Sequence, residues 1–297
     1  MKHITTSPIA PLTKAPKTLL ITPTNGICSI AANTLEIKNI TKIFNPDTAN
    51  EKVALDNLSL TLEDGDFVTV IGGNGAGKST LLNAVAGTFP VDAGNIIIDG
   101  EDITKLPEYK RAKFIGRVFQ DPMTGTAADM WIEENMALAM RRGKSRGFSW
   151  AINDKDRRVY RKMLSRLDLG LEDRLFHKVG LLSGGQRQAI TLLMASMNHP
   201  KLLLLDEHTA ALDPKTAAKV LSITKEIVEE EKLTTIMITH NMKDAIAYGN
   251  RLIMMNSGKI IIDIKGEEKK KLTVEALLNA FAKAGSDGAA NDRMLLI

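Results

Sequence analysis

The chain has 297 residues, of which 44% are hydrophobic and 25% charged, a composition typical of soluble globular proteins. The formal charge of +4 is compatible with a membrane surface or nucleic acid without requiring either, and the aromatic content of 4% argues against a stacking platform for single-stranded nucleic acid. Cys28 is the only cysteine, which excludes an intramolecular disulfide or a cysteine metal cluster and suits a reducing cytoplasm.

Residues 1–33 differ from the rest of the chain, because they are rich in Ser, Thr and Pro and contain no acidic residue. Prolines interrupt the apolar patches of this segment, which argues against a secretory signal, and its lack of arginine weakens the case for a transit peptide. We expect a flexible tail, with a functional segment as the alternative. No apolar run of the chain approaches the roughly 18 residues of a membrane helix, so other chains are expected to supply any membrane-spanning part.

From Leu35 onward, strand-like runs alternate with helical patterns, which predicts an α/β fold with a parallel or mixed sheet flanked by helices. The predicted strands are Phe67–Ile71, Asn95–Ile98, Ile115–Phe119, Leu202–Leu205, Thr235–Ile238 and Arg251–Met255. The predicted helices are Lys78–Ala86, Trp131–Met140, Lys155–Leu167, Gln186–Met197, Pro214–Glu230 and Val274–Ala284. The stretch from about 121 to 182 has no strong strand signal and is expected to form a helical insert.

A glycine-rich segment, 71–80, follows a predicted strand and opens a predicted helix. It matches G-x-x-x-x-G-K-[ST] on Gly72, Gly77, Lys78 and Ser79. Its glycines allow backbone N–H groups to close around phosphate oxygens, Lys78 would reach the β and γ phosphates, and Ser79 would bind Mg²⁺. An accidental glycine-rich turn is the alternative, and the strand-then-helix context argues against it. The nucleotide-binding residues expected here are Gly72, Gly73, Asn74, Gly75, Ala76, Gly77, Lys78, Ser79 and Thr80.

Two acids end the apolar run Leu202–Glu207. The carboxyl edge of an open α/β sheet is where ligands bind, so Asp206 is expected to hold Mg²⁺ there. Glu207 would polarise the attacking water as a general base. Two solvated acids at a strand end are the alternative, and the accompanying phosphate loop favours the catalytic interpretation.

A second anion site is predicted at Leu182-Ser-Gly-Gly-Gln186, just ahead of a helical run. Ser183 is a good N-cap residue, and Gly184 and Gly185 leave the backbone bare at a helix N-terminus. One nucleotide does not need two such sites. Two chains arranged head to tail would use both, with Ser183, Gly184, Gly185 and Gln186 of each chain capping the γ-phosphate held by the other.

With these motifs in this order, the chain resembles the ATPase subunits of ABC transporters over about residues 35–265. The same series contains Gln120 in Val-Phe-Gln-Asp-Pro, Asp213 in Ala-Leu-Asp, and His240 in Ile-Thr-His-Asn. The resemblance implies a P-loop NTPase fold of ABC type, a mixed sheet with an inserted helical subdomain. No internal repeat is visible, so one nucleotide-binding unit is expected per chain.

The resemblance also implies roles for four further residues. Gln120 would contact the metal or the attacking water and report the nucleotide state to the helical insert. Asp213 would bridge two subunits, and His240 would bond the γ-phosphate and orient Glu207. Phe44, expected to precede the first core strands, would stack on adenine, although a core aromatic is the alternative. His208 follows Glu207 where many relatives carry proline or a small residue, and its role stays open.

The function implied is an ATPase that uses ATP and Mg²⁺, pairs with a second copy and drives separate membrane permease subunits. An importer of a small solute is expected, at the cytoplasmic face of the cell membrane, with an extracellular substrate-binding protein and no nucleic acid. Segments 35–44, 206–214 and 240–245 resemble a bacterial group assigned to tryptophan or tyrosine uptake. One alternative is a non-transport ABC ATPase of DNA maintenance or translation, whose long heptad arms or second ATPase unit the sequence does not show. A membrane-associated ATPase that drives signalling is a further alternative, and it stays open.

The expected domain organisation is a tail at 1–33, an ATPase domain at 34–265 with its helical subdomain at about 121–182, and a C-terminal helix and tail at 266–297. Ten Lys or Arg residues and two acids lie between 141 and 166. They indicate either a solvated helical face or a docking surface for anionic lipid or a permease. The amphipathic pattern at 273–284 is expected to pack rather than to regulate.

Overall fold

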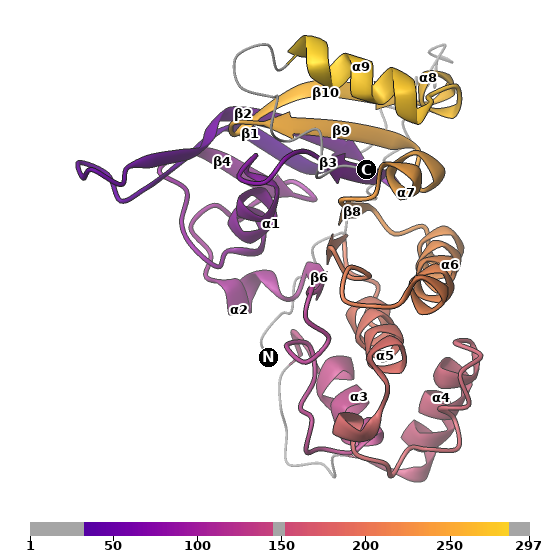
Figure 1. Ribbon diagram of the computed structural model, residues 1–297. Coiled ribbons are helices and arrows are strands. Elements are labelled where there is room, and N and C mark those ends of the chain that lie inside the picture. The colour runs from indigo at the N-terminus through magenta and orange to yellow at the C-terminus, as the bar shows by residue number, and fades with distance from the viewer. Residues whose placement is uncertain (1–32, 145–151, 285–297) are drawn as a thin grey trace, which may run out of the picture. The chain divides into compact units, whose positions relative to one another are not determined.

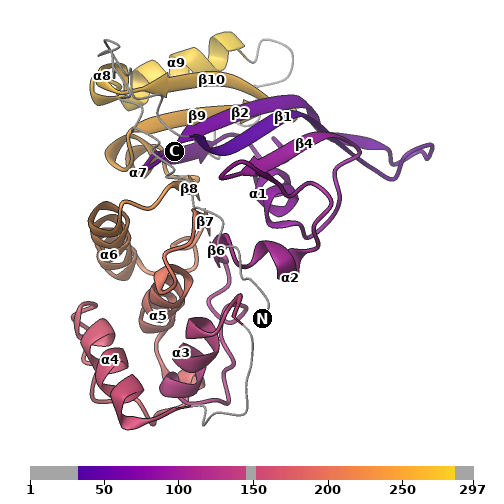
Figure 2. The ribbon, with the colours of Figure 1, turned by 180° about the vertical axis from the view of Figure 1, so that it is seen from behind.

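A computed structural model describes residues 33–144 and 152–284, which form one compact unit (Figure 1). The expectations for the N-terminal tail, for Cys28, for the basic residues within 145–151 and for the tail after residue 284 therefore lie outside the described residues. Two sheets and the helices around them make up the fold (Figures 1 and 2). In the described ranges, no helix combines the length and the apolar character needed to cross a membrane.

The larger sheet has six strands in the order β10-β9-β3-β8-β7-β6, and β9, β3, β8, β7 and β6 run parallel. Its strands are β3 (Phe67–Ile71), β6 (Ile115–Val118), β7 (Leu202–Asp206), β8 (Thr235–Ile238), β9 (Arg251–Asn256) and β10 (Lys259–Lys265). All five residues of the central strand β3 are buried, as a strand covered on both faces requires. The carboxyl ends of β3, β6, β7 and β8 consequently meet at one edge of the sheet.

The smaller sheet is antiparallel, with the order β2-β1-β4-β5. Its strands are β1 (Asn33–Phe44), β2 (Lys52–Glu63), β4 (Ala93–Ile98) and β5 (Glu101–Asp102). Neither β1 nor β2 was among the predicted strands. Phe44 is the last residue of β1 and precedes β3, the first strand of the larger sheet along the chain.

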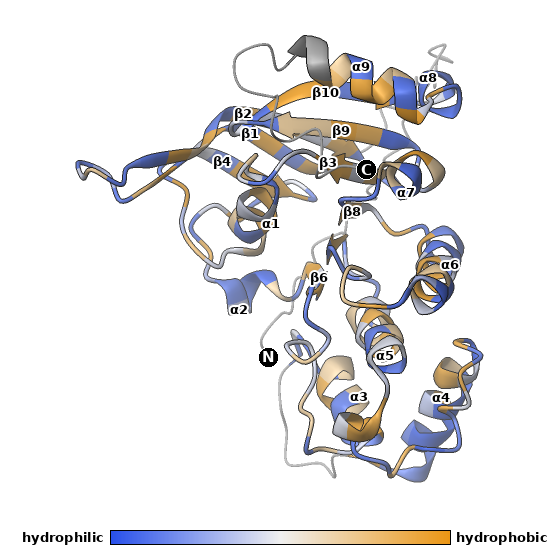
Figure 3. Cartoon of the chain, in the orientation of Figure 1, coloured by the Kyte–Doolittle hydropathy of each residue, from blue (hydrophilic) through white to orange (hydrophobic). Residues whose placement is uncertain are grey.

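Helix α1 (Lys78–Ala86) lies between the two sheets. Its buried Leu81, Leu82 and Val85 belong to one apolar cluster with residues of both sheets, such as Ile96 of β4 and Leu204 of β7. A short helix, α2 (Glu108–Arg111), follows the smaller sheet and is hydrophilic in Figure 3. Because α1 is held from two sides, the loop that precedes it has a fixed position relative to both sheets.

A second apolar cluster joins the larger sheet to a group of helices. These are α3 (Ile132–Met140), α4 (Asp154–Ser165), the 3₁₀ turn η1 (Val179–Leu181), α5 (Gly184–Ser196) and α6 (Pro214–Glu231). Helix α4 alternates hydrophilic and hydrophobic residues (Figure 3) and buries Tyr160 and Leu164. Between 121 and 182, the described residues contain helices and one isolated bridge, Trp131 to Lys178, in agreement with the predicted helical insert.

The C-terminal part of the described chain packs on the face of the larger sheet that lies opposite α1, the same face that α5 and α6 cover. Helices α7 (Met242–Ala247), α8 (Glu267–Lys270) and α9 (Val274–Ala284) follow β8 and β10. Leu277 and Phe281 of α9 are buried in a cluster with Met242 and Ala245 of α7. This packing confirms the expectation that the amphipathic C-terminal helix contributes to the core.

Candidate functional site

The loop between β3 and α1 has a backbone that only glycine fits at two positions. Gly72 has φ 153°, and a Cβ there would lie 2.3 Å from the carbonyl oxygen of Met255. Gly77 has φ 99°, and its Cβ would lie 2.5 Å from the carbonyl oxygen of Ala54. Gly77 is also the N-cap of α1, so the loop turns directly into a helix N-terminus, where backbone N–H groups are available to an anion.

The ammonium group of Lys78 is held inside this loop. Its Nζ donates hydrogen bonds to the carbonyl oxygens of Gly72 at 2.7 Å and Gly73 at 3.1 Å, and the residue is only 5% exposed. The positive charge of Lys78 therefore lies at the N-terminus of α1, where the helix dipole is also positive. This combination favours a phosphate group over a neutral ligand.

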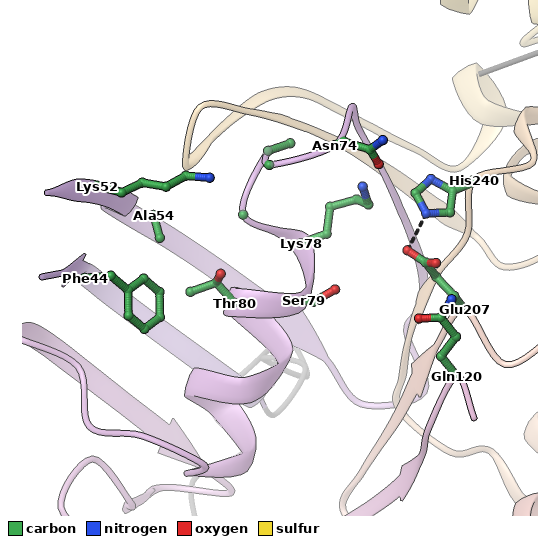
Figure 4. A pocket seen from close by; sticks show the side chains of 13 residues that line it. Phe44, Lys52, Ala54, Asn74, Lys78, Ser79, Thr80, Gln120, Glu207 and His240 are labelled. Carbon is green, nitrogen blue, oxygen red and sulfur yellow. Dashed lines mark ion pairs between the residues drawn. The ribbon is translucent and has the colours of Figure 1, made fainter. Parts of the chain in front are cut away.

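A cavity of about 430 Å³ opens beside the loop (Figure 4). Its lining brings together residues from β1, β2, the phosphate loop and the ends of β6, β7 and β8: Phe44, Lys52, Ala54, Asn74, Gly75, Ala76, Gly77, Lys78, Ser79, Thr80, Gln120, Glu207 and His240. Phe44 and Lys52 lie at one end, while Gln120, Glu207 and His240 gather at the other, with Lys78 between them (Figure 4). The cavity can thus hold a ligand with an aromatic group at one end and phosphates at the other.

Glu207 and His240 are in direct contact, because Nε2 of His240 lies 2.6 Å from Oε1 of Glu207. The Glu207 carboxylate is 10% exposed and the His240 ring 38% exposed, so both reach the cavity from its wall. Glu207 has φ 45°, a left-handed conformation that is uncommon for a residue with a side chain. Such backbone strain at a functional residue is held in place by its surroundings.

Asp206 is the last residue of β7, and its carboxylate lies beside the Ser79 hydroxyl of the phosphate loop. Burial raises the pKa of the Asp206 carboxyl, and Arg117 of β6, whose NH2 lies 3.9 Å from Oδ2 of Asp206, opposes that rise. Burial also lowers the pKa of the Arg117 guanidinium. Asp206 is therefore a largely buried carboxylate whose charge only Arg117 and Lys78 partly offset, and a bound cation would stabilise its ionised form further.

The oxygen groups near Asp206 fit Mg²⁺. Magnesium is a hard cation that is held by one or two carboxylates together with hydroxyls, water and substrate phosphates. The Asp206 carboxylate, the Ser79 hydroxyl and the Gln120 amide on the cavity wall supply such donors. Among the described residues, no group of three or more His, Cys, Asp and Glu side chains is arranged for a metal ion, so a metal here would rely on phosphate and water for its other ligands.

The second predicted anion site lies elsewhere. Ser183 caps α5, where its hydroxyl accepts the N–H of Gln186 at 3.3 Å and its own N–H donates to the Gln186 side chain at 3.2 Å. Asp213 caps α6 by accepting the N–H of Thr216 at 3.1 Å. The cavity lining of the described chain includes neither Asp213 nor any of Ser183, Gly184, Gly185 and Gln186. The structure therefore brings together most of the predicted site residues in one cavity and leaves the signature and Asp213 outside. Gly72, Gly73 and Asp206 are not part of the cavity lining either, although they adjoin residues that are.

Three residues of the site were missed by the sequence analysis. Lys52 and Ala54 line the cavity, but they lie on β2, which was not recognised as a strand. Arg117 contacts Asp206 from the adjacent strand. No motif marks these positions, and only the pairing of the strands reveals them. Phe44 lines the cavity as expected, and its ring meets that of Phe89 edge-on, with centroids 5.3 Å apart.

Comparisons with known proteins agree with this site. The family model described as "ABC transporter" matches residues 55–210, more than half of the chain. A tyrosine transport ATP-binding protein of Clostridioides difficile is 46% identical over 84% of this chain and 99% of its own length. A spermidine/putrescine import ATP-binding protein of Haemophilus ducreyi is 34% identical over 77% of this chain and 57% of its own length. The dimeric, post-hydrolysis structure of an ATP-binding cassette with ADP and Pi has a TM-score of 0.67 and 30% identity, over 78% of this chain and 98% of that one.

The chain belongs to the ABC transporter family, as one of its ATP-binding subunits. Its fold is the ABC type of the P-loop NTPase, and it is an ATPase. These findings confirm the family, fold class and activity expected from the motifs.

Proposed function

We propose that two copies of this chain close head to tail around two MgATP molecules and that hydrolysis separates them again. This arrangement is supported by the observation that the predicted site residues lie in two separate places on the chain. The phosphate loop, Glu207 and His240 share one cavity, whereas Ser183 and Gly184, at the start of α5, are exposed outside it. A partner copy can bring its own signature to this cavity. The solved relative that holds ADP and Pi is itself a dimer.

The cavity residues divide the chemistry between them. Phe44 faces adenine, and the residues Gly72–Thr80 surround the phosphates with Lys78 on the β and γ groups. Ser79, Asp206 and Gln120 hold Mg²⁺, which when bound neutralises charge that develops on the phosphate oxygens. Glu207 accepts a proton from the attacking water, and general-base catalysis of this kind contributes about 10²–10⁴ in rate.

His240 supports this chemistry from beside Glu207. Its 2.6 Å contact with Oε1 fixes the direction of the carboxylate, and its place on the cavity wall allows it to face the γ-phosphate. Ser183, Gly184, Gly185 and Gln186 of the partner copy close the γ-phosphate from the opposite side, and Asp213 contacts the other subunit near them. Loss of the γ-phosphate removes the group that both copies contact, so the affinity of the two copies for each other falls.

The work done by this cycle is transport by separate permease subunits at the cytoplasmic face of the cell membrane. Import of a small solute, and of an aromatic amino acid within that class, is favoured by the 46% identical relative named for tyrosine transport. An extracellular substrate-binding protein would deliver the solute to the permease. The helical insert near Gln120 would transmit the closing and opening of the two copies to the permease subunits.

Glu207→Gln tests the head-to-tail arrangement. The amide cannot accept a proton, so this variant should bind ATP without hydrolysing it and should sediment as a dimer in MgATP and as a monomer in MgADP. Glu226→Gln is the matched control, because Glu226 is exposed on α6 and remote from the cavity; it should hydrolyse ATP normally. Ser183→Arg added to Glu207→Gln should keep ATP binding and abolish the dimer. A Glu207→Gln variant that binds ATP yet stays monomeric at high protein concentration would refute the arrangement.

A further inference from the structure

His208 directly follows Glu207, but its side chain points into the core. The residue is 2% exposed and is absent from the described cavity lining. Its Nε2 lies 3.0 Å from the hydroxyl oxygen of Thr224, a fully buried residue in the middle of α6. The side chain after the catalytic carboxylate is thus bonded to a helix that does not touch the nucleotide cavity.

The direction of this hydrogen bond follows from the contacts of Thr224. The Thr224 hydroxyl donates its only hydrogen to the carbonyl oxygen of Val220 at 2.8 Å. Its oxygen is left to accept, so Nε2 of His208 carries the proton and donates. The chain of bonds runs from His208 through Thr224 into the backbone of α6.

Glu207 depends on its neighbours for its conformation. Its left-handed φ of 45° is unfavourable for a residue with a side chain and is kept only by its surroundings. On one side, its N–H donates to the carbonyl oxygen of Ile238 at 3.1 Å, which continues the pairing of β7 with β8. On the other side, the carbonyl oxygen of Glu207 accepts the N–H of Ala210 at 2.9 Å, and the His208 ring is the buried anchor of this turn.

We propose that His208 is a positioning residue, which aims the Glu207 carboxylate by tying its backbone to Thr224 of α6. The inference rests on the proposed role of Glu207 as general base. Helix α6 begins at the cap residue Asp213, which is proposed to meet the partner copy. The hydrogen bond between His208 and Thr224 therefore makes the position of the Glu207 carboxylate depend on the position of α6 when two copies close.

Two matched pairs of variants test this role in the full-length chain. His208→Asn removes the donor at Nε2, whereas His208→Gln can place an amide N–H near the same point. Thr224→Val removes the acceptor, whereas Thr224→Ser keeps it. We expect His208→Asn and Thr224→Val each to lower kcat for ATP about tenfold, since a small misplacement of a catalytic group is costly, while KM for ATP stays within about twofold. His208→Gln and Thr224→Ser should stay near wild-type kcat.

A hydrogen bond shared by the two residues also predicts that the double variant, His208→Asn with Thr224→Val, is no slower than either single variant. A merely structural role would lower stability in all four variants and leave kcat of the folded protein unchanged. Equal kcat for His208→Asn and His208→Gln, with Thr224→Val also at the wild-type value, would overturn the proposal. If His208→Asn fails to fold, the kcat of Thr224→Val compared with that of Thr224→Ser tests the proposal in its place.

A failure of the role proposed for His208 can be distinguished from a failure of the proposed function. If Glu207→Gln hydrolyses ATP at the wild-type rate, the role of Glu207 as general base fails, and the role of His208 with it. If Glu207→Gln is inactive while His208→Asn and Thr224→Val retain full kcat, only the positioning role fails.

Discussion

Lys269 of α8 illustrates how one buried charge anchors a segment far from the catalytic residues. The residue is 2% exposed, and its amine donates to the carbonyl oxygens of Tyr248 and of Gly249, the latter at 3.0 Å, just beyond α7. Carbonyl groups at a helix C-terminus lack partners and attract cations. Burial nevertheless lowers the pKa of Lys269 to about 8, because the charged form loses its hydration.

This lowered pKa predicts how stability varies with pH. Between pH 8 and 10.5 the folded protein has released the Lys269 proton while the unfolded chain still binds it, so the free energy of unfolding rises with pH. The full difference corresponds to about 3 kcal/mol. Denaturant titrations should show this rise in the wild type and not in Lys269→Met. Lys270→Met, at an exposed neighbour paired with Glu267, should keep the wild-type profile. Identical profiles for Lys269→Met and the wild type would contradict the prediction.

At the scale of single residues, the contacts of Lys78 lie within one motif, which the sequence makes visible. The contact between Glu207 and His240 joins the ends of β7 and β8, and it was expected only from the resemblance to ABC ATPases. Arg117 and Lys269 could not be predicted, since each acts on residues brought near only by folding. An isolated basic residue in a sequence is most often solvated, and nothing distinguishes these two before the strands and helices are assembled.

Among the elements, α9 makes the clearest test of packing. Phe281 is 2% exposed and lies in a cluster with Met242 and Ala245 of α7, the helix that follows His240. Phe281→Ala should destabilise the protein by about 3–5 kcal/mol, because it removes a buried aromatic and leaves a cavity. Asn279→Ala, at an exposed position of the same helix, should change stability by less than about 0.5 kcal/mol. Equal midpoints of thermal unfolding for the two variants would show that α9 does not contribute to the core.

The elements that the sequence predicted are those with one dominant signal. The buried run of β3 and the apolar periodicity of α6 are continuous, and their observed bounds match the predicted ones within a residue. Register shifts interrupt the alternation of buried and exposed residues over much of the β1–β2 pair, although Leu58–Glu63 of β2 alternates strictly and was overlooked. Helix α7 spans only Met242–Ala247, too short for a periodic pattern to be recognised.

At the scale of the whole molecule, the basic stretch between residues 141 and 166 is either a solvated face or the surface that docks on a membrane or a permease. Arg157 pairs with Glu133 at 2.8 Å and Arg166 with Glu230 at 2.6 Å, so part of its charge is used within the chain. Arg158 and Arg161 of α4 are exposed. Within the described part of the stretch, α4 therefore offers exposed positive charge to a docking partner.

Charge reversal at Arg158 and Arg161 should therefore release the protein from native membranes while ATP binding is retained. Each cationic side chain near an anionic membrane surface contributes about 1 kcal/mol, so the bound fraction should fall by at least tenfold. Lys105→Glu with Lys110→Glu, also at exposed positions, gives the same change in net charge and should remain attached. The multi-span protein that is recovered with the wild type identifies the permease. Unchanged attachment would leave α4 as a solvated face, and recovery of DNA or ribosomes would contradict a transport role.

The contact between α5 and α6 has a further consequence for pairing. A Cβ on Gly185 would lie 2.0 Å from the Thr216 methyl group, and the N–H of Thr216 is bonded to Asp213. The starts of the two helices are thus interlocked, and neither can shift without displacing the other. In the proposed head-to-tail pair, the signature and Asp213 of one copy would therefore approach the cavity of the other together, as one unit. A change at Gly185 or Thr216 would then disturb both contacts with the partner at once.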